Sequence, residues 1–181
     1  HQDEYHSLEA LLSELYGRAA LLFNSGYHAN TGMVSAIAQA GKTLIVADKL
    51  AHASIIDGMT LSKAPFTRFR HNDLNHLRHI LDKEAAGYEH ALVIVESVYS
   101  MDGDRADLQG LAGIKRDYPG VLLYVDEAHA FGVEGKRGLG LSRSSEHYSD
   151  IDIVVGTFGK ACASMGAFCA VAPDLRDYLV N

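Results

Sequence analysis

Apolar residues follow two patterns along the chain, and the patterns predict different elements. In some segments the apolar residues are continuous, which is typical of parallel strands covered on both faces. In others they recur every three or four residues, which is typical of a helix with one buried side. Strands are predicted over 19–26, 43–48, 91–98, 121–128, 152–158 and 166–172, with an alternating, half-buried edge strand over 66–70.

Segments with helical spacing lie between these strands. In the first of them Leu8, Leu11, Leu12 and Leu15 form an apolar stripe. The alternation of strands and helices predicts an α/β domain whose mostly parallel sheet has helices on both faces. In such sheets ligands bind beyond the carboxyl ends of the strands, so the polar residues after each strand are the candidates for function. Helices are predicted over 7–16, 29–40, 52–63, 72–87 and 108–120, and from Pro173 onward.

Length and charge narrow the class of protein. The 181 residues suffice for one domain with a substantial core, and the net charge of −7 argues against a nucleic-acid partner. No apolar run approaches the ~20 residues of a membrane span, so no membrane partner is expected. Cys162 and Cys169 fit no metal spacing and are expected to be small buried residues, which indicates a reducing, cytoplasmic location. The chain begins and stops inside helical patterns, so we expect it to be part of a longer protein.

Two stretches suggest an ATP-driven motor. "DEAH" (126–129) resembles the acidic box of a helicase, and "AIAQAGKT" (36–43) is one small residue short of a P-loop. A P-loop follows a strand and opens a helix, whereas Gly41-Lys42 follows a predicted helix and opens a strand. We therefore interpret Gly41 as the cap of that helix. No G-x-G-x-x-G is present either, which argues against a nucleotide-binding α/β domain.

The strand ends carry a set of residues suited to one cofactor. Lys160 lies between an apolar strand and a small, uncharged segment, so we expect it to be partly desolvated and nucleophilic. Asp126 could serve a cationic ring nitrogen. Gly26 and Tyr27 at a helix N-terminus, with the Thr157 hydroxyl, could hold a phosphate. A lysine, an aspartate and a phosphate site are what pyridoxal 5'-phosphate requires.

The order of the motifs gives a resemblance to a known family. "HSLEALLSELYG", "LLFNSGYHANTG", "VIVESVYSMDGD", "VDEAHAFGVEGKRGLG" and "VVGTFGKA" occur in this order over nearly the whole chain. In this the sequence resembles the α-oxoamine synthases, enzymes that join an amino acid to an acyl-CoA. The resemblance implies the large domain of an aspartate aminotransferase-like fold over 1–181, with a seven-stranded sheet. It also implies an N-terminal segment and a small C-terminal domain outside this chain.

The resemblance gives roles to the residues around the cofactor ring. Lys160 would be the Schiff-base lysine and the base that removes the substrate's Cα proton. Asp126 would pair with the pyridinium nitrogen. His129, together with Ser100, would hydrogen-bond the phenolic oxygen, and His52 would stack on the ring and contact the substrate.

Further positions match the family at the phosphate and beside the ring. Gly26 and Tyr27 would place backbone N–H groups at the phosphate, and Thr157 would add a hydroxyl. Glu96 matches an acidic position of the family motif and is expected to contact the cofactor.

The reaction implied is a decarboxylative condensation. Two stretches, "VVGTFGKACASMGAF" and "AFGVEGKRGLG", are most similar to the member that joins L-alanine to pimeloyl-CoA or a pimeloyl carrier protein in biotin biosynthesis. Members that use glycine or serine remain alternatives, because "ACASMG" departs from the glycine-rich sequence common after the lysine. A homodimer is expected. A noncatalytic relative is the remaining alternative, but it predicts loss of Lys160 or Asp126, and both are present.

Overall fold

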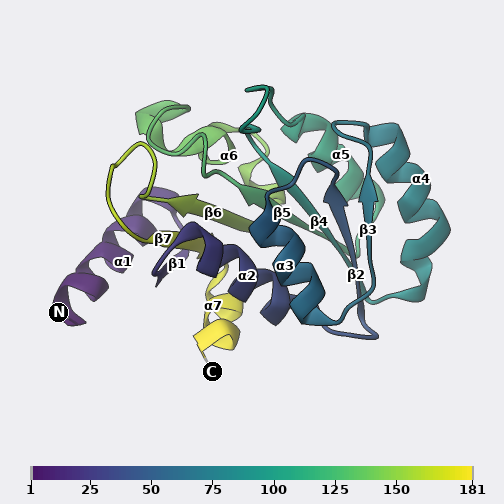
Figure 1. The fold of residues 1–181 in the computed structure, drawn as a ribbon, viewed down its shortest axis with the longest axis horizontal. Coiled ribbons are helices and arrows are strands. Elements are labelled where there is room, and N and C mark those ends of the chain that lie inside the picture. Colours follow the sequence, from purple (N-terminus) through teal and green to yellow (C-terminus); the bar gives the residue numbers. More distant parts are fainter. Residues whose placement is uncertain (1, 181) are drawn as a thin grey trace.

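A single seven-stranded sheet organises the computed structural model, which describes residues 2–180 (Figure 1). The strand order is β1-β7-β6-β5-β4-β2-β3. The five strands from β6 to β3 are parallel, and β7 is antiparallel to both β6 and β1. The mostly parallel seven-stranded sheet expected from the sequence is therefore confirmed. The strands are β1 (Ala19–Phe23), β2 (Thr43–Asp48), β3 (Phe66–Phe69), β4 (His90–Glu96), β5 (Val121–Asp126), β6 (Ile153–Thr157) and β7 (Ala167–Val171).

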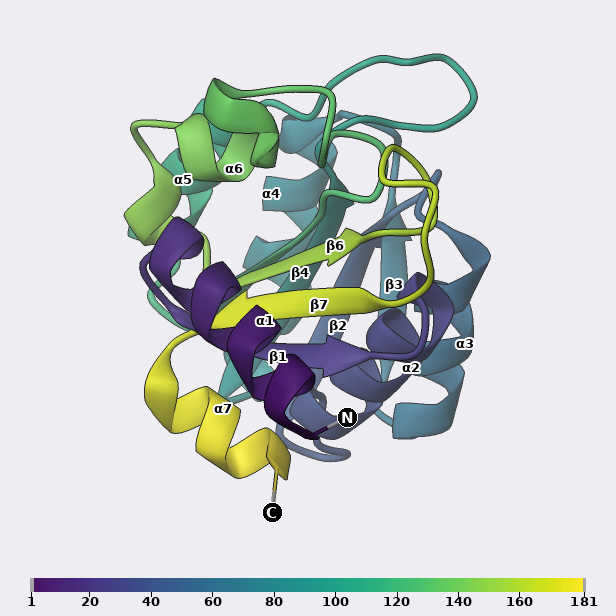
Figure 2. The same ribbon diagram turned by 90° about the vertical axis from the view of Figure 1, so that its left-hand side faces the viewer.

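Helices cover both faces of the sheet. One apolar cluster joins the sheet to α1, α4 and α5, and a second joins its other face to α2, α3 and α7. Figure 2 shows this arrangement from the β1 edge, with α5 and α3 on opposite sides. The helices are α1 (Gln2–Tyr16), α2 (Gly26–Ile37), α3 (Ala53–Ser62), α4 (Leu74–Glu84), α5 (Leu108–Asp117), the short α6 (Gly140–Ser144) and α7 (Pro173–Val180).

The continuous apolar runs have a direct explanation in β4. Val93 and Val95 point into the cluster beneath α4 and α5, whereas Leu92 and Ile94 point into the cluster beneath α2 and α3. Successive side chains of a strand face opposite sides, so a strand buried on both sides needs apolar residues at every position. None of the helices described over residues 2–180 is long and apolar enough to cross a bilayer.

The start of α2 differs from the prediction in a way that bears on function. Ser25 caps the helix, and its hydroxyl accepts a hydrogen bond from the His28 N–H at 3.2 Å. The helix therefore begins at Gly26, three residues before the predicted start, and β1 ends at Phe23. As a result, Gly26 and Tyr27 occupy the first turn of α2, where backbone N–H groups have no partner within the helix.

Two smaller predictions are wrong. Gly41 does not cap the preceding helix: Ala38 is the C-cap of α2, and Gly41 lies in the following turn with φ +80°. The exclusion of a P-loop still holds, because Lys42 directly precedes strand β2 and its ammonium lies 3.6 Å from the Glu89 carboxylate. Cys169 is buried as expected, but Cys162 is exposed because it lies in the loop between β6 and β7.

Candidate active site

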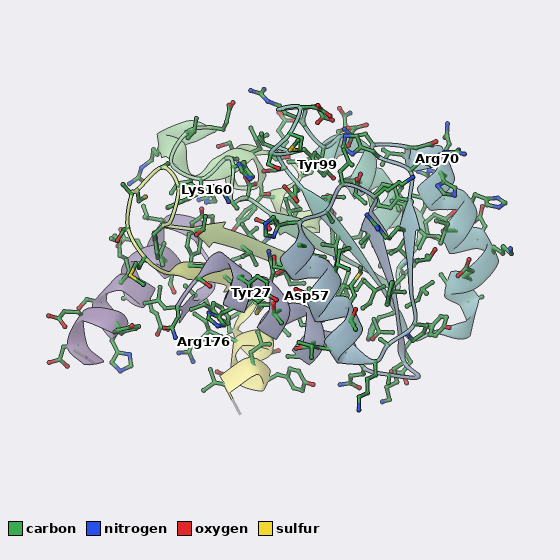
Figure 3. All side chains as sticks on the ribbon, viewed as in Figure 1. Tyr27, Asp57, Arg70, Tyr99, Lys160 and Arg176 are labelled. Carbon is green, nitrogen blue, oxygen red and sulfur yellow. The ribbon has the colours of Figure 1, made fainter. Side chains whose placement is uncertain are left out.

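A cavity of about 230 Å³ opens at the carboxyl ends of β4, β5 and β6. It gathers every residue predicted for the site except Ser100. In Figure 3, Lys160 lies on the loop after β6 and Tyr27 lies at the start of α2. The lining consists of Gly26, Tyr27, Asn30, His52, Ser54, Glu96, Asp126, Ala128, His129, Val155, Gly156, Thr157, Gly159 and Lys160.

One end of the cavity is suited to an anion. The first turn of α2 meets the end of β6 here, and a Cβ added to Gly26 would lie 3.5 Å from the Thr157 hydroxyl oxygen. The Tyr27 side chain turns away, and its hydroxyl donates to the Asp57 carboxylate at 2.5 Å. Tyr27 therefore offers the cavity its backbone rather than its phenol. Unpaired N–H groups at a helix N-terminus favour a phosphate.

The cavity also holds a buried carboxylate in a fixed orientation. Asp126 is 4% exposed. Its Oδ1 accepts from the Ala128 N–H at 2.8 Å, and its Oδ2 accepts from the Asn30 side-chain amide at 2.7 Å. The side-chain oxygen of Asn30, Oδ1, in turn accepts from the Tyr124 hydroxyl at 2.7 Å. The network fixes the orientation of the carboxylate.

His52 caps a helix and also lines the cavity. It is the N-cap of α3, and its Nδ1 accepts from the Ser54 N–H at 3.2 Å. The Ser54 hydroxyl lies 2.8 Å from the same nitrogen and accepts from the Asn30 amide at 3.0 Å. These contacts leave the proton of a neutral ring on Nε2. The imidazole is thus fixed at the cavity wall by the same network that holds Asp126.

Three titratable residues surround the space between these groups. Burial, followed by the neighbouring Asp126, raises the pKa of Glu96 to about 8. Burial, followed by the charge of Lys160, lowers the pKa of His129. The expectation that Lys160 is partly desolvated is wrong for this chain, because residues 159–165 form an exposed loop between β6 and β7.

Ser100 does not line the cavity with the other predicted residues. It lies in the turn after β4, where the neighbouring Tyr99 is buried and Ser100 itself is exposed. Asn30 and Ser54 line the cavity but are not among the site residues predicted from the sequence. A polar Asn on the buried face of the predicted helix over 29–40 was the available signal, because such a residue needs hydrogen-bond partners inside the fold.

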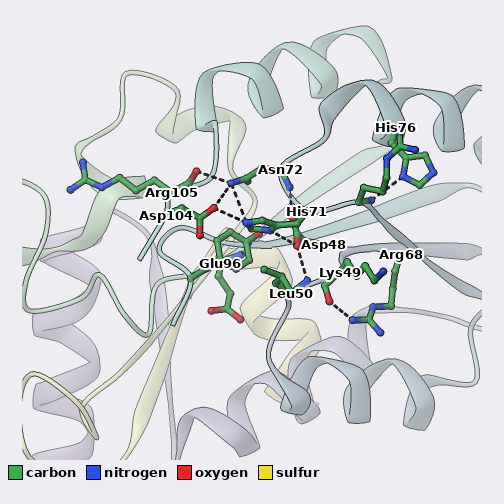
Figure 4. Close-up of polar contacts among 12 residues, drawn as sticks. Asp48, Lys49, Leu50, Arg68, His71, Asn72, His76, Glu96, Asp104 and Arg105 are labelled. Carbon is green, nitrogen blue, oxygen red and sulfur yellow. Dashed lines mark hydrogen bonds and ion pairs between the residues drawn. The ribbon is translucent and has the colours of Figure 1, made fainter. Parts of the chain in front are cut away.

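A cluster of polar side chains holds the turn after β4 in place (Figure 4). The His71 ring bridges two carboxylates, with Nδ1 at 2.9 Å from Asp48 Oδ1 and Nε2 at 2.6 Å from Asp104 Oδ2. The Asn72 side-chain amide donates to the same Asp104 oxygen at 2.7 Å. Tyr99 packs edge-on against His71 with its ring 4.5 Å away. These contacts tie the turn 97–105, next to the cavity, to the ends of β2 and β3.

The His71 cluster predicts a pH-dependent stability. Burial lowers the pKa of His71, but hydrogen bonds to Asp48 and Asp104 outweigh it and raise the pKa above 6.5. The charged ring therefore stabilises the fold below pH ~6.5, and this contribution of about 1 kcal/mol is lost as the pH rises through the raised value. In urea unfolding of the complete natural protein, the free energy of unfolding should fall by this amount as the pH rises. In His71→Gln this part of the fall should be absent.

The difference between wild type and variant isolates His71 from other groups that titrate in the same range. His79→Gln is the matched control, because His79 is exposed on α4. Parallel pH curves for wild type and His71→Gln would show that the bridge contributes nothing.

The second acid of "DEAH" faces the opposite side of the sheet from Asp126. Glu127 is fully buried. Its carboxylate accepts from the Ser97 hydroxyl at 2.6 Å and from the N–H groups of Leu141 and Ser142 at 3.1 and 2.6 Å. It therefore fixes the start of α6 and does not face the cavity. Among residues 2–180, no group of His, Cys, Asp and Glu side chains could hold a metal ion.

Comparison with known proteins identifies the family. The aminotransferase class I and II family matches residues 1–181. A Pasteurella multocida protein named "Putative 8-amino-7-oxononanoate synthase" is 56% identical over 178 residues, which are 98% of this chain and 46% of the relative.

Solved structures agree with this result. Serine palmitoyltransferase of Sphingomonas wittichii superposes with a TM-score of 0.89 at 38% identity, over 97% of this chain and 43% of that protein. 8-Amino-7-oxononanoate synthase of Francisella tularensis superposes with a TM-score of 0.85 at 34% identity, over 98% of this chain and 50% of that protein. Several solved serine palmitoyltransferase structures contain pyridoxal 5'-phosphate, one of them as the internal aldimine. The chain spans about half the length of the relatives it matches, and it belongs to the aminotransferase class I and II family and, within it, to the pyridoxal-phosphate-dependent α-oxoamine synthases.

Proposed function

We propose that this chain is the cofactor-binding part of an enzyme that condenses an amino acid with an acyl-CoA and releases carbon dioxide. The observation that carries the proposal is the convergence of Lys160, Asp126 and the first turn of α2 on one cavity. An amine, a buried carboxylate and an anion-binding helix end match the aldehyde, ring nitrogen and phosphate of pyridoxal 5'-phosphate. When bound, this cofactor supplies an electron-withdrawing ring that stabilises a carbanion at the Cα of the amino acid.

Five residues of the cavity would hold the cofactor, and one of them would also act on the substrate. Gly26 and Tyr27 would hold the phosphate through their N–H groups, with the Thr157 side chain beside them. Lys160 would bind the cofactor covalently, and its amine would take the Cα proton of the substrate. Asp126, fixed by its hydrogen bonds, would keep a proton on the ring nitrogen.

The remaining predicted residues would act around the ring. His52, fixed by α3, would lie against the ring face, and His129 would hydrogen-bond the phenolic oxygen as a neutral imidazole. Ser100 stays a prediction for the same oxygen, and its turn would have to approach the cavity to reach it.

The substrates we propose are L-alanine and pimeloyl-CoA or a pimeloyl carrier protein, with 8-amino-7-oxononanoate as the product. The names of two similar curated relatives support this choice. The likeness to serine palmitoyltransferase keeps serine as an alternative, and glycine is the third. Release of free CoA on addition of each amino acid with its acyl-CoA separates the three, because only the correct pair should turn over.

We also propose that residues 1–181 form the large domain of a homodimer. The exposed position of Lys160 supports this, because a nucleophilic lysine needs a desolvated setting that this chain does not supply by itself. Cross-linking of the complete protein, with and without cofactor, tests the dimer.

Lys160→Ala tests the cofactor site itself. Adding pyridoxal 5'-phosphate to the wild-type protein should give a visible absorption band, and borohydride should fix the cofactor to a peptide that contains Lys160. Lys160→Ala should show neither result. Lys136→Ala is the control, because Lys136 lies in an exposed turn outside the cavity. Absence of a band in the complete wild-type protein would overturn the proposed function.

A further inference from the structure

Two carboxylic acids are buried side by side in the cavity. Glu96 and Asp126 are register partners at the ends of the neighbouring strands β4 and β5, and both line the cavity. They are 3% and 4% exposed. Among residues 2–180, neither forms an ion pair with a Lys or Arg within 4.0 Å. Two adjacent negative charges that are removed from water repel each other, so such a pair retains a proton.

The hydrogen bonds around the pair are unequal. Asp126 accepts from a side-chain amide, that of Asn30, and from the backbone N–H of Ala128. Among residues 2–180, the donor to the Glu96 carboxyl is a backbone N–H group, that of His52. Donors directed at a carboxylate stabilise its charged form, so the acid with fewer donors holds the proton.

We infer that the proton of this pair resides on Glu96, which leaves Asp126 as the single buried anion of the cavity. Glu96 is then a positioning residue that acts through Asp126. Its role toward the cofactor depends on the proposed function, because one buried negative charge matches one cationic ring nitrogen. The location of the proton itself is a property of the protein alone.

The electrostatic surroundings agree with this assignment. Burial and the charge of Asp126 raise the pKa of Glu96 to about 8, so its neutral form predominates at neutral pH. Lys160 opposes the shift and Asp48, at the end of β2, adds to it. The titratable groups that face Glu96 from the surrounding elements are Asp48, Tyr99, Asp126, Lys160, His52 and His129.

Infrared spectroscopy of the complete protein without added cofactor tests the inference. A protonated carboxylic acid has a C=O stretch distinct from that of a carboxylate, and carbon-13 labelling of glutamate assigns it to this residue type. We expect a band that is present at neutral pH and disappears with a midpoint near pH 8. Glu96→Gln should lack that band. Glu127→Gln should retain it, which separates Glu96 from the other buried glutamate.

The coupling to Asp126 gives a second readout. In Asp126→Asn the midpoint of the Glu96 band should fall below that of the wild type, because the like charge is gone. Burial, the larger cause of the raised pKa, should keep it above the ordinary glutamate value of about 4.3. Asn30→Ala should also lower it, because an Asp126 with fewer donors takes a larger share of the proton.

Two results would overturn the inference. The first is a band assigned to Glu96 that has already vanished by about pH 6; the second is a midpoint that neither variant moves. Both readouts use protein without added cofactor, so a failure to bind pyridoxal 5'-phosphate would count against the proposed function and leave them intact.

Discussion

Asp126→Asn is expected to lower the turnover of the complete enzyme by about 10²–10³-fold, the usual loss when one preorganised electrostatic contact is removed from a closed site. An amide carries no negative charge and cannot keep a proton on a nitrogen that faces it. The variant should fold, because Asn has nearly the same shape as Asp. A destabilisation of about 1–2 kcal/mol is expected, since the amide nitrogen must face either the Ala128 N–H or the Asn30 side-chain amide.

Initial rates of CoA release with L-alanine and pimeloyl-CoA measure the effect, and circular dichroism checks the fold. Asp117→Asn is the matched control, because it makes the same change on the exposed side of α5. If the folded Asp126→Asn enzyme kept wild-type turnover, the assignment of Asp126 to the ring nitrogen would be wrong.

Much of the fold could be predicted because each strand carries its own signal. A strand such as β2, whose six residues are all buried, reads as one apolar run, and its predicted bounds 43–48 agree with the structure. The last residue of a strand is harder to predict where polar residues follow it. The predicted strand over 19–26 continues past the end of β1 at Phe23 and through Gly26, because periodicity cannot distinguish a serine that caps the next helix from one in a turn.

The candidate site could be predicted where its residues follow a strand directly. Asp126 and Thr157 are the last residues of β5 and β6, so the topology alone brings them to one edge. Asn30 is not predicted from the sequence because it lies inside a helix, and only the three-dimensional packing of α2 against β6 and β7 brings its side chain to Asp126. The exposure of Lys160 could not be predicted from the sequence either. The apolar residues before it are in β6, whereas those after it form an open loop.

Glu127→Ala is expected to cost at least about 3 kcal/mol of unfolding free energy. The side chain is fully buried, and its removal leaves three donors without an acceptor, the Ser97 hydroxyl and the N–H groups of Leu141 and Ser142. An unsatisfied buried donor costs about 1–3 kcal/mol. Gly140 reflects the same close packing, since its φ is +86° and an added Cβ would lie 2.5 Å from a Glu127 oxygen.

Urea unfolding followed by circular dichroism should show this loss, with the exposed Glu146→Ala within about 0.5 kcal/mol of wild type as the matched control. The free energy of unfolding of Glu127→Gln should lie between those of Glu127→Ala and the wild type, because an amide has one acceptor oxygen where the carboxylate has two. Wild-type stability in Glu127→Ala would mean that the loop before α6 finds other acceptors. The large loss expected here, beside the small one in Asp126→Asn, would separate the two acids of "DEAH": the first would serve chemistry in the cavity and the second would hold the loop that follows it.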